Sequence, residues 1–427
     1  MARRAPAKNT APRAAPRLGW HDHLRALLTS EAHFEAFQTR GVYVEGPAKY
    51  STWANYLETF DEVVVLARVA EGASPASEEA RADGSGVSFC ALPDYHGPWG
   101  YLRRLPELKR RAREAIRNCD AYVLRVPGLV GRLVWRELAK TGKPYALEIV
   151  GDPWDALGPG TVRTALRPVL RRAAASELRT MCRGAIAIHY VTQRALQQRY
   201  PPAKGVYAVG FSDALMDSAF ASQADIERRW ERIDDAIGKS ADRPLRVGFV
   251  GSLSQLYKGP EVLLRAVAEC ASRGLSIEAL LAGDGRYLPA MKSLAAELGI
   301  GAHTQFLGQL PFGQSVLEFL DSVDLFVMPS YAEGLPRALL EAMARGCPCI
   351  GSNVGGIPEL LRPEDMVPAR DAHALAAKLL ESARSPDELK RMSQRNLEKA
   401  REFNPEALRQ IRRAFYEFVK LHSVARS

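Results

Sequence analysis

Two acidic residues, Glu333 and Glu341, are separated by seven residues where a buried-looking strand (324–328) ends and a helix is predicted to begin. The helix is predicted to start at Gly334, directly after the first acid. The free amide groups of Gly334 and Leu335, together with the helix dipole, would form a site for an anion, and phosphate is its natural ligand. The stretch therefore predicts a phosphate-binding helix start with an acid on either side.

The spacing of the two acids restricts what they can do together. A helix rises about 1.5 Å per residue, so Glu341 would lie roughly 12 Å beyond Glu333, on nearly the same helix face. At that distance the carboxylates cannot share a proton or a metal ion, but they can hold hydroxyls at the two ends of a ligand with a phosphate bridge in its middle. Alternatively, Glu333 is an N-terminal helix charge and Glu341 a surface acid. The apolar neighbours Leu340 and Ala342 argue against an idle acid there.

Small residues and one lysine follow other predicted strands of the second half. Parallel strands end on one edge of a sheet, and ligands bind beyond that edge. A lysine in such a loop can offer a point charge to a diphosphate. A single glycine usually just ends a strand, but several such loops together predict a ligand site. The residues concerned are Gly251, Ser252, Lys258, Gly259 and Gly283.

Strand-length apolar runs alternate with helical periodicity along the chain, a pattern typical of parallel α/β sheets. In the first half, strands are predicted near residues 41, 62, 121, 145 and 185. In the second half they are predicted at 245–250, 277–282, 304–307, 324–328 and 348–351, with helices beginning near 259, 287, 313, 334 and 371. We predict two doubly wound, Rossmann-like domains facing one cleft.

The predicted domain boundaries follow changes of composition. Residues 222–244 are polar and charged and are predicted to be a linker. The domains are then a disordered basic tail (1–18), a first domain (19–221), a second domain (245–404) and a final helix (405–427).

The charge is unevenly distributed. The 427 residues carry a net charge of +9, and five positive charges lie within residues 1–18, which contain no acid. No uncharged apolar run approaches the roughly 18 residues that span a bilayer, and no signal-like segment is present, so a cytoplasmic location is predicted. The Cys-x-Cys at 347–349 has no second cluster to complete a zinc site.

Two helix-compatible stretches, 102–117 and 167–183, are basic. Such surfaces can face anionic lipid, a phosphorylated substrate or nucleic acid, or can simply be solvated helix faces. Aromatic residues are not interleaved with the basic ones and no recognised module is present, so nucleic acid is not a predicted partner. An anionic membrane surface and a purely solubilising role remain open.

Four segments of the second half resemble one enzyme family. "FVGSLSQLYKGPEVLLRA", "LLAGDG", "FLGQLP" and "DLFVMPSYAEGLPRALLEAMARGCPCIGSNVGGIPELL" resemble the C-terminal half of retaining glycosyltransferases of family 4, in order over residues 246–361, with the Glu-x7-Glu signature intact. The resemblance implies a GT-B fold in which the first domain (19–221) is on the acceptor side and the second (245–404) binds the donor. It also implies that the last helix (405–427) crosses back onto the first domain. It also implies transfer of a sugar from a nucleotide-diphosphate sugar to a carbohydrate or lipid-linked acceptor, in polysaccharide or glycolipid synthesis, with no metal and no cofactor.

The resemblance also implies roles for individual residues. Glu333 would face the donor sugar and Glu341 the ribose hydroxyls, while Lys258 with the amides of Gly334 and Leu335 would hold the diphosphate. Lys258 and Glu333 are thus the catalytic candidates. The wider donor-binding set that the motifs imply is Gly251, Ser252, Lys258, Gly283, Gly308, Gly334, Leu335, Pro336, Arg337 and Glu341.

Two positions depart from the family pattern. The family commonly has an arginine six residues before the lysine, where this chain has Ser252, so Arg337 or a first-domain arginine is the candidate replacement. The family often has a histidine where this chain has Gly151 and Asp152. Asp152 is the candidate replacement, for a contact to the sugar or acceptor, and is the third catalytic candidate.

Acceptor residues are less clearly indicated. Gly46 and Tyr50, in the loop 41–53, and Trp154 are predicted on the acceptor side. These aromatic residues, with Trp53, Tyr95, His96 and Trp99, form a sugar-stacking wall or pack in the core.

Two other functions are alternatives for a chain of this fold. A sugar-nucleotide epimerase of similar fold would need a denser set of acids and histidines than this chain has. A non-catalytic scaffold would explain the missing arginine and histidine, but Lys258, Glu333 and Glu341 are all present. No Asp-x-Asp occurs, which disfavours a metal-dependent transferase, and no G-x-G-x-x-G follows a strand, which disfavours a dinucleotide-dependent oxidoreductase.

Overall fold

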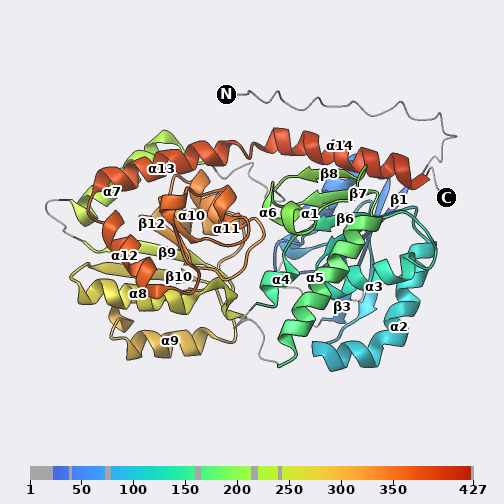
Figure 1. Cartoon of the computed structure of the whole chain (residues 1–427), viewed down its shortest axis with the longest axis horizontal. Helices are drawn as coiled ribbons and strands as arrows, with labels where there is room; N and C mark the ends of the chain where they lie inside the picture. The colour runs from blue at the N-terminus through green and yellow to red at the C-terminus, as the bar shows by residue number, and fades with distance from the viewer. Residues whose placement is uncertain are drawn as a thin grey trace, which may run out of the picture.

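The structure is a computed structural model that describes residues 23–37, 41–72, 78–158, 165–212, 220–238 and 243–424. The predicted tail (1–18) lies outside these residues. Two α/β domains with parallel sheets lie side by side (Figure 1). The predicted fold class, two Rossmann-like domains, is confirmed.

The first sheet has the strand order β4-β3-β1-β5-β6-β7-β8 among the described residues, and β2 pairs antiparallel with β1. If β2 is left out and the other strands are numbered in chain order, this is the 3-2-1-4-5-6 order of doubly wound folds, with one further strand at the end. The strands are β1 (Arg25–Phe37), β2 (Gly41–Tyr43), β3 (Glu62–Glu71), β4 (Val87–Pro93), β5 (Ala121–Val126), β6 (Ala146–Ile149), β7 (Ala187–Tyr190) and β8 (Tyr207–Gly210).

Sequence predictions for this domain are partly right. The strands expected near residues 62, 121, 145 and 185 are β3, β5, β6 and β7. The run near residue 41 is only the short hairpin strand β2, and β1, β4 and β8 were missed. The helices are α1 (Tyr50–Ala54), α2 (Gly97–Arg117), α3 (Leu129–Leu138), α4 (Pro153–Ala156), α5 (Arg167–Gly184) and α6 (Ala195–Arg199).

The second sheet has the order β11-β10-β9-β12-β13-β14, again 3-2-1-4-5-6. Its first five strands match the sequence prediction within a residue or two. They are β9 (Leu245–Val250), β10 (Ile277–Ala282), β11 (Thr304–Gly308), β12 (Leu325–Met328) and β13 (Cys349–Ser352), followed by β14 (Met366–Val367). The strand order reverses between β9 and β12, so ligands are expected beyond the carboxyl ends of these two strands.

The helices of this domain follow its strands. They are α8 (Pro260–Ser272), α9 (Leu288–Glu297), α10 (Gln314–Ser322), α11 (Arg337–Ala344), α12 (Ala372–Ser382) and α13 (Pro386–Arg401). Most of the predicted linker is also a helix, α7 (Gln223–Ile237), which starts with a capping box between Ser222 and Asp225. Apolar residues recur at helical spacing within this polar sequence, so one face of α7 can pack against the second domain. Ile233 on that face is buried in the core of the second domain.

The last helix, α14 (Pro405–Val424), returns to the first domain. Figure 1 shows α13 and α14 in succession along one side of both domains. The Tyr416 hydroxyl donates to the buried Glu148 of β6, and Lys420 Nζ donates to the Thr59 carbonyl at 2.7 Å. The predicted crossing of the final helix is confirmed. No helix in the described part of the chain has the length and apolarity to cross a membrane.

Candidate functional site

Lys258 and Glu333 meet at the point where the strand order of the second sheet reverses. Lys258 ends a short 3-10 turn (Leu256–Lys258) after β9, and Glu333 follows β12. Lys258 Nζ lies 2.7 Å from Oε1 and 3.0 Å from Oε2 of Glu333. Their side chains are only 17% and 6% exposed. Two residues 75 positions apart therefore form one charged centre where a doubly wound sheet binds its ligand.

Backbone contacts hold the two loops together. The Tyr331 amide donates to the Tyr257 carbonyl at 2.6 Å. Gly259 has a φ of 72°, and a Cβ there would lie 2.1 Å from the Pro329 carbonyl oxygen. Only glycine allows this approach without strain. Gly259 therefore sets the distance between the lysine loop and the glutamate loop.

The glycine pair after β13 packs against the Glu333 loop from the other side. A Cβ on Gly355, whose φ is 56°, would lie 2.0 Å from the Glu333 carbonyl oxygen. The Gly356 amide donates to the Gly334 carbonyl at 2.8 Å. These glycines position the backbone of Glu333 and Gly334.

The predicted helix start at Gly334 is wrong. Helix α11 begins at Arg337 with Pro336 as its N-cap, and residues 334–336 are not helical. The contacts with Gly355 and Gly356 hold residues 334–336 in a non-helical conformation. The helix-based distance of about 12 Å between the two acids does not apply, because only half of the interval is helical.

The Lys258–Glu333 pair keeps Lys258 charged. Burial alone would lower the pKa of the Lys258 ammonium. The charge of Glu333, its hydrogen bond to Lys258 and the nearby Tyr257 together outweigh burial, and the pKa is raised. A buried ion pair contributes little to stability, because desolvation offsets the attraction. A positive charge held in this way is available for an anionic ligand.

Glu341 lies on α11, and its side chain has no hydrogen-bond or ion-pair partner among the described residues. Burial raises the pKa of its carboxyl group, and the nearby charge of Arg337 opposes that rise. Arg337 is exposed, and its charge also acts on Lys258. An unpartnered, partly buried carboxylate is suited to accept hydrogen bonds from a ligand's hydroxyls.

Three predicted donor-site glycines pack the strand ends together. A Cβ on Gly283, whose φ is 151°, would lie 1.9 Å from the Gly251 carbonyl oxygen, and the Gly283 amide donates to Gly308 at 2.7 Å. Ser252 is exposed, and its hydroxyl accepts from the Ser254 amide at 3.2 Å. Their contacts with a donor stay predictions.

The first domain touches the site through the segment after β6. A Cβ on Gly334 would lie 2.8 Å from the Val150 carbonyl oxygen. Asp152 is next to this contact, but its own domain engages both carboxylate oxygens. Oδ1 accepts from the Trp154 amide at 2.8 Å and from the Tyr200 hydroxyl at 2.5 Å, and Oδ2 pairs with Arg199. A role for Asp152 at the sugar would require some of these bonds to be exchanged.

The predicted acceptor residues are not brought together. Gly46 faces the second domain, where a Cβ would lie 4.0 Å from the Phe312 ring. The Tyr50 hydroxyl instead donates to the Ser85 carbonyl at 2.8 Å. Trp154 lies under the Arg171 guanidinium, 3.9 Å from the ring centroid. Both aromatic residues therefore have packing partners within the first domain.

Sequence reasoning missed one contact between the domains. The Glu359 carboxylate accepts from the amides of Gln193, Arg194 and Ala195, at 2.6, 2.9 and 2.8 Å. Glu359 belongs to the second domain, whereas the three amides begin α6 of the first. The "SNVGGIPE" motif ends on this acid, but its partners lie more than 160 residues away and leave no local signal.

Residues 231–399 match the family model "Glycosyl transferases group 1". Over 329 residues the chain is 25% identical to Protein CapJ of Staphylococcus aureus, covering 74% of this chain and 78% of that protein. It is 32% identical to the putative colanic acid biosynthesis glycosyltransferase WcaL of Salmonella typhimurium over 181 residues, 40% of this chain and 44% of WcaL. This match therefore spans less than half of either protein.

Solved structures share the whole two-domain fold. Sucrose-phosphate synthase from Thermosynechococcus elongatus superposes with a TM-score of 0.69 at 18% identity, covering 94% of this chain and all of that one. HepE of Anabaena, solved in complex with UDP and glucose, superposes with a TM-score of 0.62 at 18% identity, covering 91% and 98%. The second domain therefore matches the group 1 glycosyltransferase family model, and the whole chain has the two-domain GT-B fold of these structures.

Proposed function

We infer that this chain transfers a sugar, with retention of anomeric configuration, from a nucleotide-diphosphate sugar to a lipid-linked carbohydrate acceptor in polysaccharide or glycolipid synthesis. The observation that carries the proposal is the buried Lys258–Glu333 pair at the reversal point of the second sheet, with the unpartnered Glu341 nearby. The pathway in WcaL's name, colanic acid biosynthesis, and the UDP in the HepE complex support the substrate class.

In the proposed donor complex, the charged side chains bind different parts of the nucleotide sugar. Lys258 and Arg337 face the diphosphate, with the first turn of α11 as a further source of amide donors. Glu333 accepts from sugar hydroxyls and Glu341 from the ribose hydroxyls. The positive charges lie on the chain itself, so we propose that donor binding needs no metal ion.

In the proposed reaction, the bond between the anomeric carbon and the diphosphate oxygen breaks, and the acceptor oxygen bonds to the same face of that carbon. The leaving phosphate oxygen takes the acceptor's proton, so the protein need not supply a base. Negative charge grows on the diphosphate as its bond breaks. Lys258 is placed to stabilise that charge more strongly in the transition state than in the ground state.

Turnover of a panel of sugar nucleotides in the presence of a lipid-linked acceptor mixture tests the function. We expect release of a nucleoside diphosphate and a product whose anomeric proton, followed by NMR, has the configuration of the donor. An inverted product would contradict the retaining mechanism, and no turnover of any donor would favour a scaffold.

The acceptor side of the proposal rests on exposed apolar residues of the first domain. Ion pairs between Arg113 and Glu137 and between Arg132 and Glu177, both at 2.7 Å, show that α3 lies between α2 and α5. Each of these helices follows a strand of one parallel sheet, so their N-termini lie at its carboxyl edge. The exposed apolar side chains near these N-termini are Trp99, Leu102, Leu129, Leu166, Val169 and Leu170.

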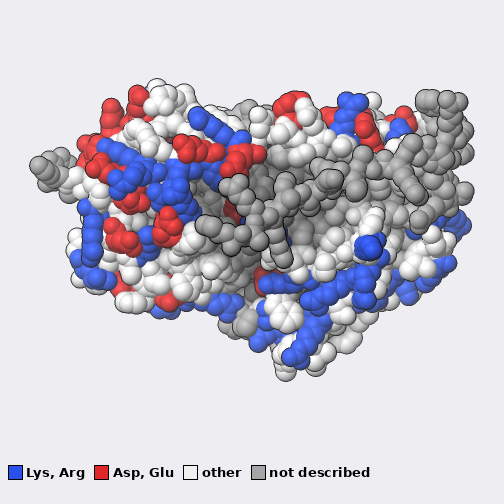
Figure 2. All heavy atoms as spheres, turned by 45° about the horizontal axis from the view of Figure 1, so that its top comes forward, with Lys and Arg blue, Asp and Glu red and all other residues white. Residues whose placement is uncertain are grey.

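Basic residues accompany these apolar ones. Arg103, Arg104 and Arg172 are exposed on the same helices. Figure 2 shows Lys and Arg gathered in a band over the first domain, whereas most acids in this view lie on the second. Apolar side chains rimmed by basic ones are typical of surfaces that lie on anionic membranes, where each Lys or Arg contributes about 1 kcal/mol. We propose that this surface brings the active site to a membrane-linked acceptor.

Vesicle sedimentation tests the membrane surface. The double variant Trp99→Ser/Leu166→Ser and the double variant Arg103→Gln/Arg104→Gln should each reduce sedimentation with anionic vesicles at low salt. Leu307→Ser, an exposed leucine of the second domain, is the matched control and should bind like the parent. Arg113 is unsuitable for the test, because its loss would leave the buried Glu137 with fewer partners. Equal binding to neutral and anionic vesicles would contradict the charge contribution.

A further inference from the structure

Three potential metal ligands come together in the first domain, away from the donor site. His33 lies in β1, Asp94 directly follows β4, and His96 is the N-cap of α2. Strand β3 lies between β1 and β4 in the sheet. Its residue Arg68 pairs with His33 of β1, and the next residue, Val69, pairs with Pro93, the last residue of β4. The fold thus places side chains 61 residues apart at one edge of the sheet.

The three side chains converge on one point. His33 Nδ1 lies 3.2 Å from Asp94 Oδ1, and His96 Nε2 lies 3.3 Å from Asp94 Oδ2. The two imidazole rings are stacked at 5.4 Å between centroids. One ligand atom from each residue can be chosen so that all three lie within 4.8 Å of one another. Among the described residues this is the one such group of three.

The two nitrogen–oxygen separations, one to each carboxylate oxygen of Asp94, are close to those between ligands of a tetrahedral metal ion. Zinc ligands at about 2.0–2.1 Å from the ion lie roughly 3.3 Å apart from one another. Two imidazoles and one carboxylate are ligands that Zn²⁺ and related transition metals prefer, whereas Ca²⁺ and Mg²⁺ prefer oxygen alone. The cluster is also accessible, because the side chains of His33, Asp94 and His96 are 48%, 26% and 82% exposed.

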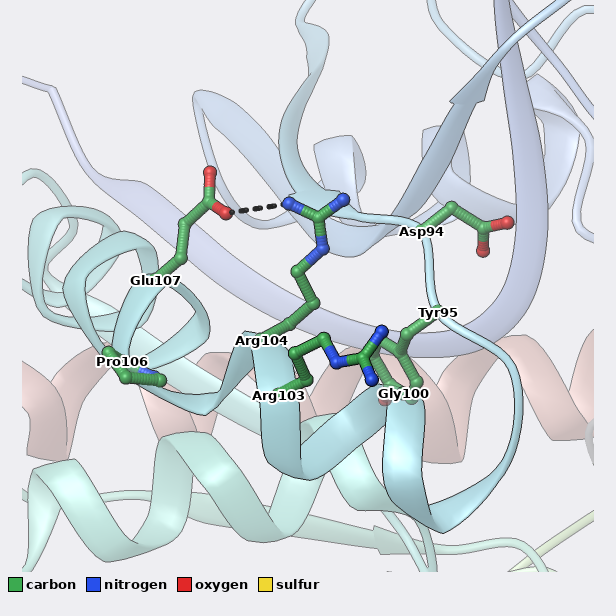
Figure 3. Close-up of a pocket in the computed structure, with 7 residues that line it drawn as sticks. All are labelled: Asp94, Tyr95, Gly100, Arg103, Arg104, Pro106 and Glu107. Carbon is green, nitrogen blue, oxygen red and sulfur yellow. Dashed lines mark hydrogen bonds and ion pairs between the residues drawn. The ribbon is translucent and has the colours of Figure 1, made fainter.

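The surrounding charges leave the carboxylate of Asp94 available. Figure 3 shows Asp94 at the margin of a cavity of about 390 Å³, with its carboxylate pointing away from Arg103 and Arg104. Arg104 lies instead 3.5 Å from Glu107. The other nearby cation, Arg68, donates to the Glu31 carbonyl and stacks 5.0 Å from the Tyr95 ring centroid.

We propose that His33, Asp94 and His96 bind one divalent transition-metal ion, with Zn²⁺ the best match, and leave its remaining coordination position to water or an anionic ligand. The site lies in the other domain from Lys258 and Glu333. It is therefore distinct from the donor site, where we propose that no metal is required. The alternative for these residues is a histidine–aspartate–histidine hydrogen-bonded cluster without an ion.

Metal titration of the full chain distinguishes a metal site from a hydrogen-bonded cluster without an ion. After treatment with a chelator and its removal, Zn²⁺ should bind with a stoichiometry of one in calorimetry, and Co²⁺ should give a visible absorption band. His33→Ala, Asp94→Asn and His96→Ala should each weaken binding by more than the roughly 10- to 100-fold that loss of an outer-shell partner costs. His373→Ala is the matched control, since His373 is exposed and lies 2.9 Å from Glu269, and it should change nothing.

Two results would overturn the proposal. One is the absence of saturable one-to-one binding, and the other is binding that all three ligand variants retain. His96 is so exposed that its replacement leaves the fold intact, which a thermal melt checks. UDP affinity measured with and without Zn²⁺ should be the same, so failure of the metal site and failure of the proposed transferase function are separately observable.

Discussion

Lys258→Ala is expected to lower kcat for sugar transfer roughly 100- to 1000-fold, the scale for removing one group that stabilises transition-state charge. Lys258 is the cation held closest to Glu333, with a side chain only 17% exposed, so bulk water does not substitute for its charge. Initial rates at saturating donor measure the effect. Lys292→Ala, which removes an exposed lysine of α9, is the matched control and should retain full activity.

Loss of Lys258 also leaves Glu333 buried without its partner, which by itself destabilises a fold by several kcal/mol. The double variant Lys258→Gln/Glu333→Gln removes both charges and avoids that cost. It should melt close to the parent and still lack activity. A well-folded double variant with parental kcat would contradict the catalytic assignment of this pair.

Glu341→Gln is expected to weaken nucleoside diphosphate binding by about 1–3 kcal/mol, the scale of a hydrogen bond to a charged group. Because about 1.4 kcal/mol is a factor of ten, the dissociation constant should rise roughly 5- to 150-fold. Calorimetry with UDP and with its 2′-deoxy analogue measures the loss and its source. The deoxy analogue should bind the variant almost as well as UDP does. Glu297→Gln, an exposed acid at the end of α9, is the control and should bind UDP like the parent.

The free protein should respond to Glu341→Gln in the opposite direction. The pKa of Glu341 is raised in the folded state, so the folded chain binds its proton more tightly than the unfolded chain does. Its ionisation therefore costs stability as pH rises from the ordinary value of 4.5 through the raised pKa. At neutral pH the variant should melt no lower than the parent, and the difference should shrink in acid. A less stable variant would indicate a structural rather than a ligand-binding carboxylate.

The second domain was largely predictable because its strands are continuous apolar runs between glycine-rich loops. β1 of the first domain was not, because polar residues interrupt it. The Thr29 hydroxyl accepts from the Arg125 amide at 2.9 Å, and Glu31 accepts from the Val130 amide at the start of α3 at 2.6 Å. These partners are about a hundred residues away. A buried polar strand of this kind resembles a loop or a helix when only its own residues are considered.

The candidate site was also predictable only where its residues depend on their own part of the sequence. The acids, the lysine and the glycines were identified from their spacing, since they follow strands of one sheet. The start of α11 was misplaced because the Gly355–Gly356 contact that holds residues 334–336 lies twenty residues further on. Asp152 was chosen for its position in the chain, but Arg199 and Tyr200, which occupy its oxygens, come from another element.

The most direct measurement is a calorimetric titration of the full chain with UDP in excess chelator. Lys258, Arg337 and Glu341 belong to the chain itself, so one-to-one binding should persist without any divalent ion and should weaken in Lys258→Gln/Glu333→Gln and in Glu341→Gln. Binding that disappears in chelator, or that is unchanged in both variants, would contradict a metal-free nucleotide-sugar site at the carboxyl ends of β9 and β12.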